Sequence, residues 1–248
     1  ELVLYSVKGG REEQQDCSGY EIADDRLMAV ICDGMGGEND GKKASNTAVG
    51  EFLNQYLLSE NDGKPDDFFE KAIVSANSAI CSFTDKNGNM VCAVTTVVCI
   101  LIADGLLRWA SVGDSRLYIL RDNELVQATT DHNYALSLSE QLKNGNIDRQ
   151  TYETEMLQGD GLTSFLGVGR EMQVDINVRG IPLHSGDRIL MTTDGLYKLV
   201  SDEEINRILT NFKNIGEAVQ ALEMKASHGA LKKRTVRDNM TIALVNIK

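Results

Sequence analysis

Apolar and polar positions divide this chain into blocks that predict both strands and one-sided helices. The apolar run Leu27 to Cys32 predicts a strand, and the glycines of Asp33-Gly34-Met35-Gly36-Gly37 predict a tight turn directly after it. From Ala44 onward, small and apolar residues recur at helical spacing, and a second one-sided helix is predicted to begin near Pro65. A strand, a glycine-rich turn and two helices therefore begin the chain.

The middle of the chain is dominated by strand patterns. The segments Cys92 to Ala103, Leu106 to Val112 and Arg116 to Leu120 are predicted strands. Asp104-Gly105 and the corner Gly113-Asp114-Ser115 connect them. Short connections between consecutive strands favour antiparallel pairing, so these strands are predicted to form a meander.

The last part of the chain returns to mixed helix and strand. Gln141 to Gly169 is polar and irregular and predicts only two short helical turns. Ser201 and Glu204 form a capping box for a helix, and another helix is predicted over Ile215 to Ala226. Further strands are predicted at Met172 to Arg179, Arg188 to Thr193 and Met240 to Ile247. Strands cluster instead of alternating with helices, which favours an α+β fold with two antiparallel sheets covered by helices over a parallel doubly wound sheet.

Composition narrows the class of protein. The 248 residues include only two prolines and no linker or repeat, so residues 1–248 are predicted to form a single domain, which we expect to be a monomer. The net charge of −12 opposes binding to nucleic acid or to anionic membranes, and favours cations as small partners. The longest apolar run, Val97 to Ala103, is too short for a membrane span. Five cysteines without a C-x-x-C pair favour reduced thiols in a cytoplasmic protein over disulfides or zinc.

Aspartates at the ends of apolar strands are the candidate chemistry. Asp33-Gly34 and Asp194-Gly195 each follow such a strand, and Asp16, Asp114 and Asp238 are further candidates. Carboxylate and backbone carbonyl oxygens are the hard ligands that Mg²⁺ and Mn²⁺ prefer. Asp-Gly is also a frequent turn dipeptide, and Asp104-Gly105 is interpreted as a plain turn. Spacing alone leaves metal ligands and turn residues as open alternatives for the others.

Six segments, taken in order, resemble the successive motifs of the metal-dependent protein phosphatases, also called type 2C serine/threonine phosphatases. They are Arg11-Glu12-Glu13-Gln14-Gln15-Asp16, Asp33-Gly34-Met35-Gly36-Gly37, Thr95-Thr96, Val112-Gly113-Asp114-Ser115-Arg116, Thr192-Thr193-Asp194-Gly195-Leu196 and Asp238-Asn239-Met240-Thr241. The resemblance covers nearly the whole chain. It implies a four-layer α-β-β-α sandwich with a binuclear metal centre at one end of the two sheets. Met35, where animal members carry a histidine, resembles the bacterial branch.

The resemblance also implies roles for individual residues. Asp33 would bridge two Mn²⁺ or Mg²⁺ ions, the Gly34 carbonyl would bind the second, Asp194 and Asp238 would complete the first, and Asp16 would act through water. Arg11 would hold the substrate phosphate, the alternative being a solvated surface arginine. Asp33, Asp194, Asp238 and Arg11 form the implied catalytic set. The implied reaction is hydrolysis of phosphoserine and phosphothreonine in proteins by metal-activated water, with a cognate serine/threonine kinase as a further partner.

Two departures from the family pattern matter. Gln15 replaces an acidic residue common beside the metal aspartate, and Lys198 stands where many members carry an aspartate that helps Asp114 to hold a third metal. A third metal at Asp114 therefore stays an open alternative. Both departures also motivate the alternative of a pseudophosphatase that binds phosphoproteins without turnover. His132, His184 and His228 are interpreted as structural or surface groups, and the acidic segment Glu60 to Asp67 as a solvated loop.

Overall fold

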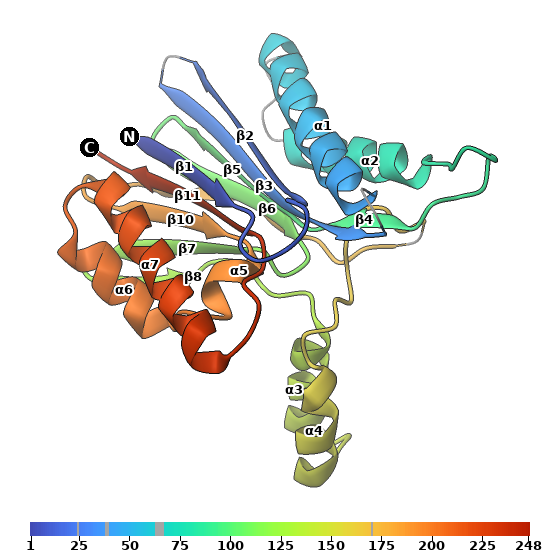
Figure 1. Cartoon of the computed structure of the whole chain (residues 1–248). Coiled ribbons are helices and arrows are strands. Elements are labelled where there is room, and N and C mark those ends of the chain that lie inside the picture. The colour runs from blue at the N-terminus through green and yellow to red at the C-terminus, as the bar shows by residue number, and fades with distance from the viewer. Residues whose placement is uncertain (24, 38–39, 63–66, 170) are drawn as a thin grey trace.

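Two antiparallel sheets lie face to face, and helices cover the outer face of each (Figure 1). The computed structural model describes residues 1–23, 25–37, 40–62, 67–169 and 171–248. The layer order confirms the predicted α+β sandwich. Within the described residues, no helix is both long enough and apolar enough to cross a membrane.

The first sheet contains both the first and the last strand of the chain. Its strand order is β1-β11-β10-β7-β8. The bounds are Leu2–Val7 for β1, Met240–Asn246 for β11, Arg188–Thr192 for β10, Arg116–Arg121 for β7 and Glu124–Gln127 for β8. Strands β1 and β11 run antiparallel from the pair Leu2 and Val245 to the pair Val7 and Met240. Residues from the two ends of the chain are therefore neighbours where β11 begins.

The second sheet has the order β2-β3-β5-β6-β9, with β4 paired to β3. The bounds are Asp16–Ala23 for β2, Arg26–Gly36 for β3, Ala93–Thr95 for β4, Val97–Ala103 for β5, Leu106–Val112 for β6 and Asp175–Pro182 for β9. The antiparallel register of β2 and β3 sets Asp16 directly opposite Asp33. Two of the candidate ligands therefore share one end of this sheet.

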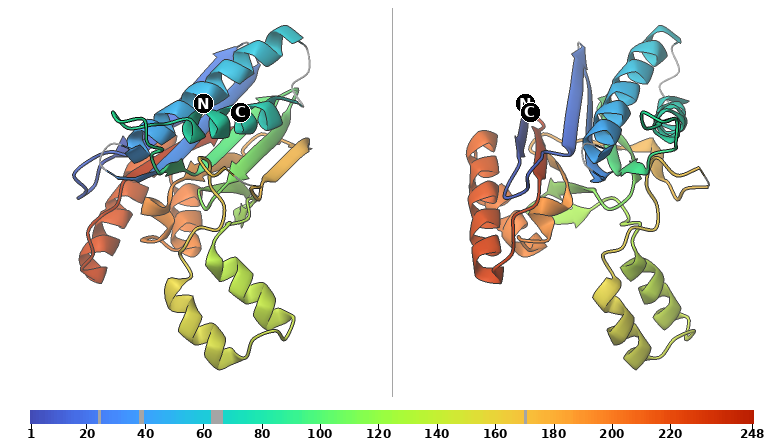
Figure 2. Two further views of the ribbon diagram at one scale, coloured as in Figure 1. Left: turned by 90° about the vertical axis from the view of Figure 1, so that its right-hand side faces the viewer. Right: turned by 45° about the vertical axis from the view of Figure 1, so that its right-hand side comes forward.

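Four long helices form the outer layers. Helices α1 (Asp40–Asp62) and α2 (Phe68–Cys81) cover the second sheet, and α6 (Asp202–Asn211) and α7 (Ile215–Lys233) cover the first. The short helix α5 (Asp194–Tyr197) follows β10 directly. Helices α3 (Tyr134–Lys143) and α4 (Arg149–Glu155), with the 3₁₀ turn η2 (Met156–Gln158), form a helical hairpin that extends away from the sandwich in all three views (Figures 1 and 2).

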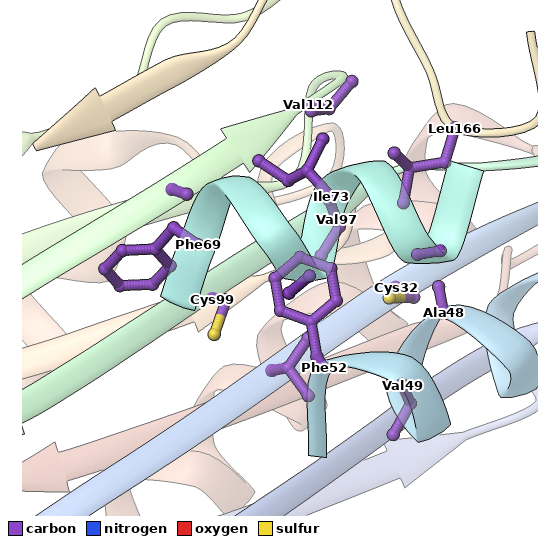
Figure 3. Close-up of a cluster of buried hydrophobic side chains, with 14 of the residues drawn as sticks. Cys32, Ala48, Val49, Phe52, Phe69, Ile73, Val97, Cys99, Val112 and Leu166 are labelled. Atoms are coloured by element: carbon purple, nitrogen blue, oxygen red, sulfur yellow. The ribbon is translucent and has the colours of Figure 1, made fainter. Parts of the chain in front are cut away.

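Three apolar clusters hold the layers together. One lies between the sheets, one between the first sheet and α6 and α7, and one between the second sheet and α1 and α2. Figure 3 shows the last of these, which includes Phe52 of α1, Phe69 and Ile73 of α2, and Cys32, Val97 and Cys99 of the sheet. Truncating a buried aromatic of this kind to alanine typically costs about 3–5 kcal/mol. All five cysteines are free thiols.

The turn predicted at residues 33–37 is wrong. Strand β3 continues to Gly36, because β4 supplies pairing partners for Gly34, Met35 and Gly36. The glycine at position 34 serves a different need, since a β-carbon there would collide with the backbone carbonyl of Gly41 at the start of α1.

The predicted meander is also wrong in part. Strand β6 pairs with β5 and β9, whereas β7 pairs with β10 and β8 in the other sheet. The corner at Gly113, whose φ of 102° suits glycine, therefore carries the chain from one sheet to the other. Alternation along a strand reports burial on its two faces and not the identity of the neighbouring strand, so the change of sheet had no local signal.

The two short helical turns predicted in Gln141 to Gly169 are confirmed as α4 and η2, whereas α3, most of which precedes this segment, was not predicted. Asn133 caps α3 by accepting from Leu136 N, and Asp148 caps α4 by accepting from Thr151 N. These caps were overlooked, and no strand was predicted for the polar β2 or the short β1 and β8. The capping box at Ser201 is confirmed, because its hydroxyl accepts from Glu204 N. Pro65 lies outside the described residues, as does half of the segment Glu60 to Asp67, into which α1 extends.

Candidate metal centre

An open cleft of about 1030 Å³ lies at the end of the sandwich where the two sheets meet. Most of the sequence-predicted site residues line it. The lining includes Arg11, Gln15, Asp33, Gly34, Met35, Asp194, Lys198, Asp238 and Asn239. Asp16 and Asp114 are buried, with 6% and 5% of their surface exposed, and do not belong to this lining.

The second sheet holds Asp33 by its backbone. The hydroxyl of Thr95 donates to Asp33 O at 2.8 Å, and Thr96 N donates to the same carbonyl at 2.9 Å. Asp33 N donates in turn to the hydroxyl oxygen of Thr96, which lies 2.8 Å from Ser115 Oγ. The Thr95-Thr96 motif therefore fixes the strand end that presents the Asp33 carboxylate to the cleft.

Thr193, which directly follows β10, and Thr241 of β11 hold Asp16. Thr193 Oγ1 and Thr241 Oγ1 both donate to Asp16 Oδ2, at 2.9 and 2.8 Å. Asp16 Oδ1 is buried and has no hydrogen-bond partner among the described residues. Burial raises the pKa of Asp16 to about 7, and the nearby charge of Asp194 also raises it. The two threonine hydrogen bonds act in the opposite direction and lower this pKa. The side chain is thus fixed at one oxygen and unsatisfied at the other.

Mutual repulsion among the carboxylates favours a bound cation. Burial and then the charges of Asp16, Asp194 and Asp114 raise the pKa of Asp33 well above its ordinary value. Burial and the charge of Asp194 raise the pKa of Asp114 to about 6. Carboxylates that oppose one another's ionisation are stabilised together by a divalent ion, and oxygen donors suit Mg²⁺ or Mn²⁺. The donor set and the orphan Asp16 oxygen therefore fit metal ions.

The ligands do not converge on a single point as they stand. In the described part of the chain, no three His, Cys, Asp or Glu side chains are close enough together to hold one ion. Asp238 instead pairs with the guanidinium of Arg11, and Asp194 Oδ2 lies 2.8 Å from Lys198 Nζ. Burial opposes the charge of Lys198, but the carboxylates of Asp194, Asp160 and Asp114 raise its pKa above the ordinary value. Two basic groups at the rim thus neutralise two of the carboxylates.

Residues 8–232 match the family described as protein phosphatase 2C. The chain belongs to this family. Protein phosphatase PhpP of Streptococcus pneumoniae is 29% identical over 249 residues, which cover 99% of this chain and 96% of PhpP. The structure of the S. agalactiae serine/threonine phosphatase is 25% identical with a TM-score of 0.83, covering 100% of this chain and 99% of that one. The catalytic domain of serine/threonine protein phosphatase PstP, in complex with two manganese ions, is 26% identical with a TM-score of 0.76, covering 100% and 98%. The predicted family is confirmed, and the chain is a protein phosphatase of the bacterial type.

One residue of this phosphatase 2C site was missed in the sequence. The side chain of Asn239, 6% exposed, donates to the carbonyls of Lys8 and Glu13, both at 2.9 Å, and accepts from Gln15 N at 2.7 Å. It therefore holds the loop that carries Arg11 against the start of β11. In the sequence, Asn239 stood out only through its place beside Asp238 in a motif. That place does not show which groups its side chain contacts.

Asn239→Ala is expected to loosen the Arg11 loop of this phosphatase. The substitution leaves the two carbonyls and one N–H of the loop without their partner, and an unsatisfied buried polar group costs about 1–3 kcal/mol. We expect a lower free energy of unfolding in chemical denaturation and a higher KM for a phosphopeptide. Asn146→Ala, at an exposed position of the hairpin, is the control and should change neither. An unchanged stability for Asn239→Ala would remove Asn239 from this role.

The remaining candidates are structural. His132 Nδ1 accepts from Gly113 N at 3.1 Å, and burial lowers the pKa of His132, so this histidine is neutral and fixes the corner that carries Asp114. Neither His184 nor His228 is among the described residues that line the cleft. Asp104 and Gly105 form the exposed turn between β5 and β6, with φ of 54° and 69°, which confirms a plain turn.

Proposed function

We propose that this phosphatase hydrolyses phosphoserine and phosphothreonine esters in proteins, using two Mn²⁺ or Mg²⁺ ions. The observation that carries this proposal is the set of carboxylates that both sheets bring to one open cleft, with a basic side chain at its rim. Asp33 comes from β3 of the second sheet, with the buried Asp16 opposite it on β2, while Asp194 follows β10 and Asp238 precedes β11 of the first sheet. An open cleft can admit a phosphorylated side chain that projects from a protein surface.

Asp33, Asp194 and Asp238 would hold the two ions, with the Gly34 carbonyl as a further ligand and Asp16 behind them. When bound, the ions supply Lewis acidity that activates a water molecule and polarises the phosphoryl group. Thr193 and Thr241 keep Asp16 in one orientation, and Thr95 and Thr96 keep Asp33 in place. We propose two ions and not three, because the ammonium of Lys198 beside Asp194 would repel a further divalent ion.

Arg11 is proposed to bind the substrate phosphate. It lies on the loop held by Asn239, and its side chain is 56% exposed. Gly9 lets this loop approach closely, because a β-carbon there would collide with the carbonyl oxygen of Asp238. The guanidinium of Arg11 pairs with Asp238 in the structure. On binding, the substrate phosphate would take the place of Asp238 as the partner of Arg11, and the metal ions would take the place of Arg11 as the partner of Asp238. The planar fork of the guanidinium can then donate to two phosphate oxygens.

Arg11→Ala is expected to raise KM for a phosphopeptide clearly and to lower kcat less. An interaction kept equally in the ground and transition states appears in KM, whereas one made only in the transition state appears in kcat. Arg11→Lys should restore little, because one ammonium cannot reproduce the bidentate fork. Steady-state kinetics of the three proteins decide the point. A pure kcat effect would instead assign Arg11 to transition-state stabilisation.

The function is tested by phosphate release from matched peptides. Purified protein with Mn²⁺ should release phosphate from a phosphoserine or phosphothreonine peptide much faster than from a phosphotyrosine peptide of the same surrounding sequence. A pseudophosphatase, the alternative suggested by Gln15 and Lys198, would bind the first two peptides without releasing phosphate. The retained carboxylates of Asp33, Asp194 and Asp238 favour turnover, since a binding domain has no need for them.

A further inference from the structure

Lys198 contacts two carboxylates that belong to different parts of the molecule. Its Nζ lies 2.8 Å from Asp194 Oδ2 in the cleft and 3.3 Å from Asp160 Oδ2. Asp160 follows η2, on the segment that returns from the helical hairpin to the sandwich. The Lys198 side chain is 37% exposed and the Asp160 side chain is 81% exposed. One lysine thus joins the metal site to the base of the hairpin.

Lys198 itself is held firmly. It follows α5, where its N–H donates to Asp194 O at 3.1 Å, and its carbonyl accepts from Lys233 Nζ of α7 at 2.6 Å. Because the backbone of Lys198 is fixed to the sandwich, its ammonium can move only a short distance. An ion pair with this ammonium therefore restricts where the segment that carries Asp160 can lie.

A few backbone hydrogen bonds hold the base of the hairpin. Tyr134 N donates to Gly161 O at 2.8 Å and Ala135 N donates to Gly159 O at 2.9 Å, which join its two legs, and His132 N donates to Gly113 O at 2.9 Å, which joins the base to the sandwich. Among the residues of α3, α4 and η2, Leu138 is the one buried side chain. A segment that buries so little apolar surface takes its orientation from a few polar contacts at its attachment point.

The hairpin base also borders the substrate path. A side pocket of about 350 Å³ is lined by Asp160 and Lys233 together with Asp194, Lys198 and Asp238, which belong to the cleft as well. The pocket therefore continues the cleft toward the hairpin. A protein substrate whose phosphorylated residue occupies the cleft would reach this pocket with its flanking residues.

We propose that Lys198 is a positioning residue that couples the hairpin to the metal site through Asp160 and Asp194. The bridge holds the hairpin base beside the cleft without an exchangeable cation, and so shapes the surface on which a protein substrate docks. This inference deepens the proposed function and rests on it for the nature of the substrate, while the bridge itself is a property of the folded chain.

Hydrogen exchange of the whole chain tests the bridge directly. Lys198→Met and Asp160→Asn should each speed exchange of amides in residues 133–163 about two- to fivefold, the change typical for loss of a partly exposed ion pair. The double variant should show no larger effect than either single variant, because both remove the same contact. Lys198→Arg should keep most of the protection. Lys232→Met, at an exposed position of α7, is the control and should leave it unchanged.

Kinetics then test the consequence for the substrate. Asp160→Asn should raise KM for a phosphorylated protein severalfold and leave KM for a small aryl phosphate unchanged, since a small ester does not reach the side pocket. Unchanged exchange in both single variants, or effects that add in the double variant, would overturn the bridge. An equal rise in KM for both substrates would overturn its role in docking. If the wild-type chain hydrolysed neither substrate, the proposed function would fail, and the exchange experiment would still decide the bridge.

Discussion

Asp33→Ala is expected to lower kcat for a phosphopeptide by several orders of magnitude. Asp33 lies where β3 faces the cleft, and its carboxylate is the proposed bridge between the two cations. Without this carboxylate, Asp194 and Asp238 alone would have to hold the ions at the phosphate. Each tenfold loss of rate corresponds to about 1.4 kcal/mol of lost transition-state stabilisation, so a thousandfold loss is about 4 kcal/mol. The loss of kcat is measured by single-turnover and steady-state phosphate release at saturating Mn²⁺.

The matched control is Asp104→Ala, which removes an Asp-Gly carboxylate from a plain turn. Asp104 is exposed and has a φ of 54°, so alanine there strains the backbone and costs some stability. The rate per folded molecule should nevertheless stay within a few-fold of wild type. Similar losses at Asp33 and Asp104 would mean that the ligands are misassigned.

Strands with strong apolar periodicity could be predicted from the sequence, and so could most of the candidate residues that line the cleft. Leu106–Val112 and Arg188–Thr192 are nearly continuous buried runs, and their bounds were found to within one residue. Asp194 lies where β10 ends, as predicted, because an apolar run that stops at Asp-Gly can mark the point where the chain leaves the core; β3, in contrast, continues past Asp33 to Gly36. Local pattern was sufficient wherever burial alone decides the structure.

Contacts between distant segments could not be predicted. The Gly113 corner moves the chain between sheets, and nothing in its sequence states which strand β7 will join. Asn239 donates a hydrogen bond to the loop that carries Arg11, and Lys198 pairs with Asp160. These groups are far apart in the sequence, and only the folded chain brings them together. Polar side chains of this kind carry no periodic signal, so the sequence showed these residues without their partners.

Removal of metal is expected to stop turnover and to lower the melting temperature. Chelation removes the ions that would supply the activated water, and it also leaves the carboxylates to repel one another. The folded-state pKa of Asp16, about 7, lies above its ordinary value of 3.8, and the pKa of Asp33 is raised as well. Between these values the folded chain binds more protons than the unfolded chain, so the contribution of such groups to stability falls as the pH rises through this window.

Added Mn²⁺ should therefore stabilise the chelated protein more at about pH 7.5 than at about pH 5, because protons at the lower pH already offset the repulsion that the ions would otherwise relieve. Calorimetric melting curves at both values of pH, with and without Mn²⁺, measure the difference. Asp33→Asn should shrink it, since an amide neither titrates nor repels its neighbours. Ca²⁺ at equal concentration tests whether charge alone suffices, because it can stabilise the carboxylates without restoring turnover. Full activity in the chelated protein, or a melting temperature indifferent to Mn²⁺ at both values of pH, would remove the carboxylate cluster from metal binding.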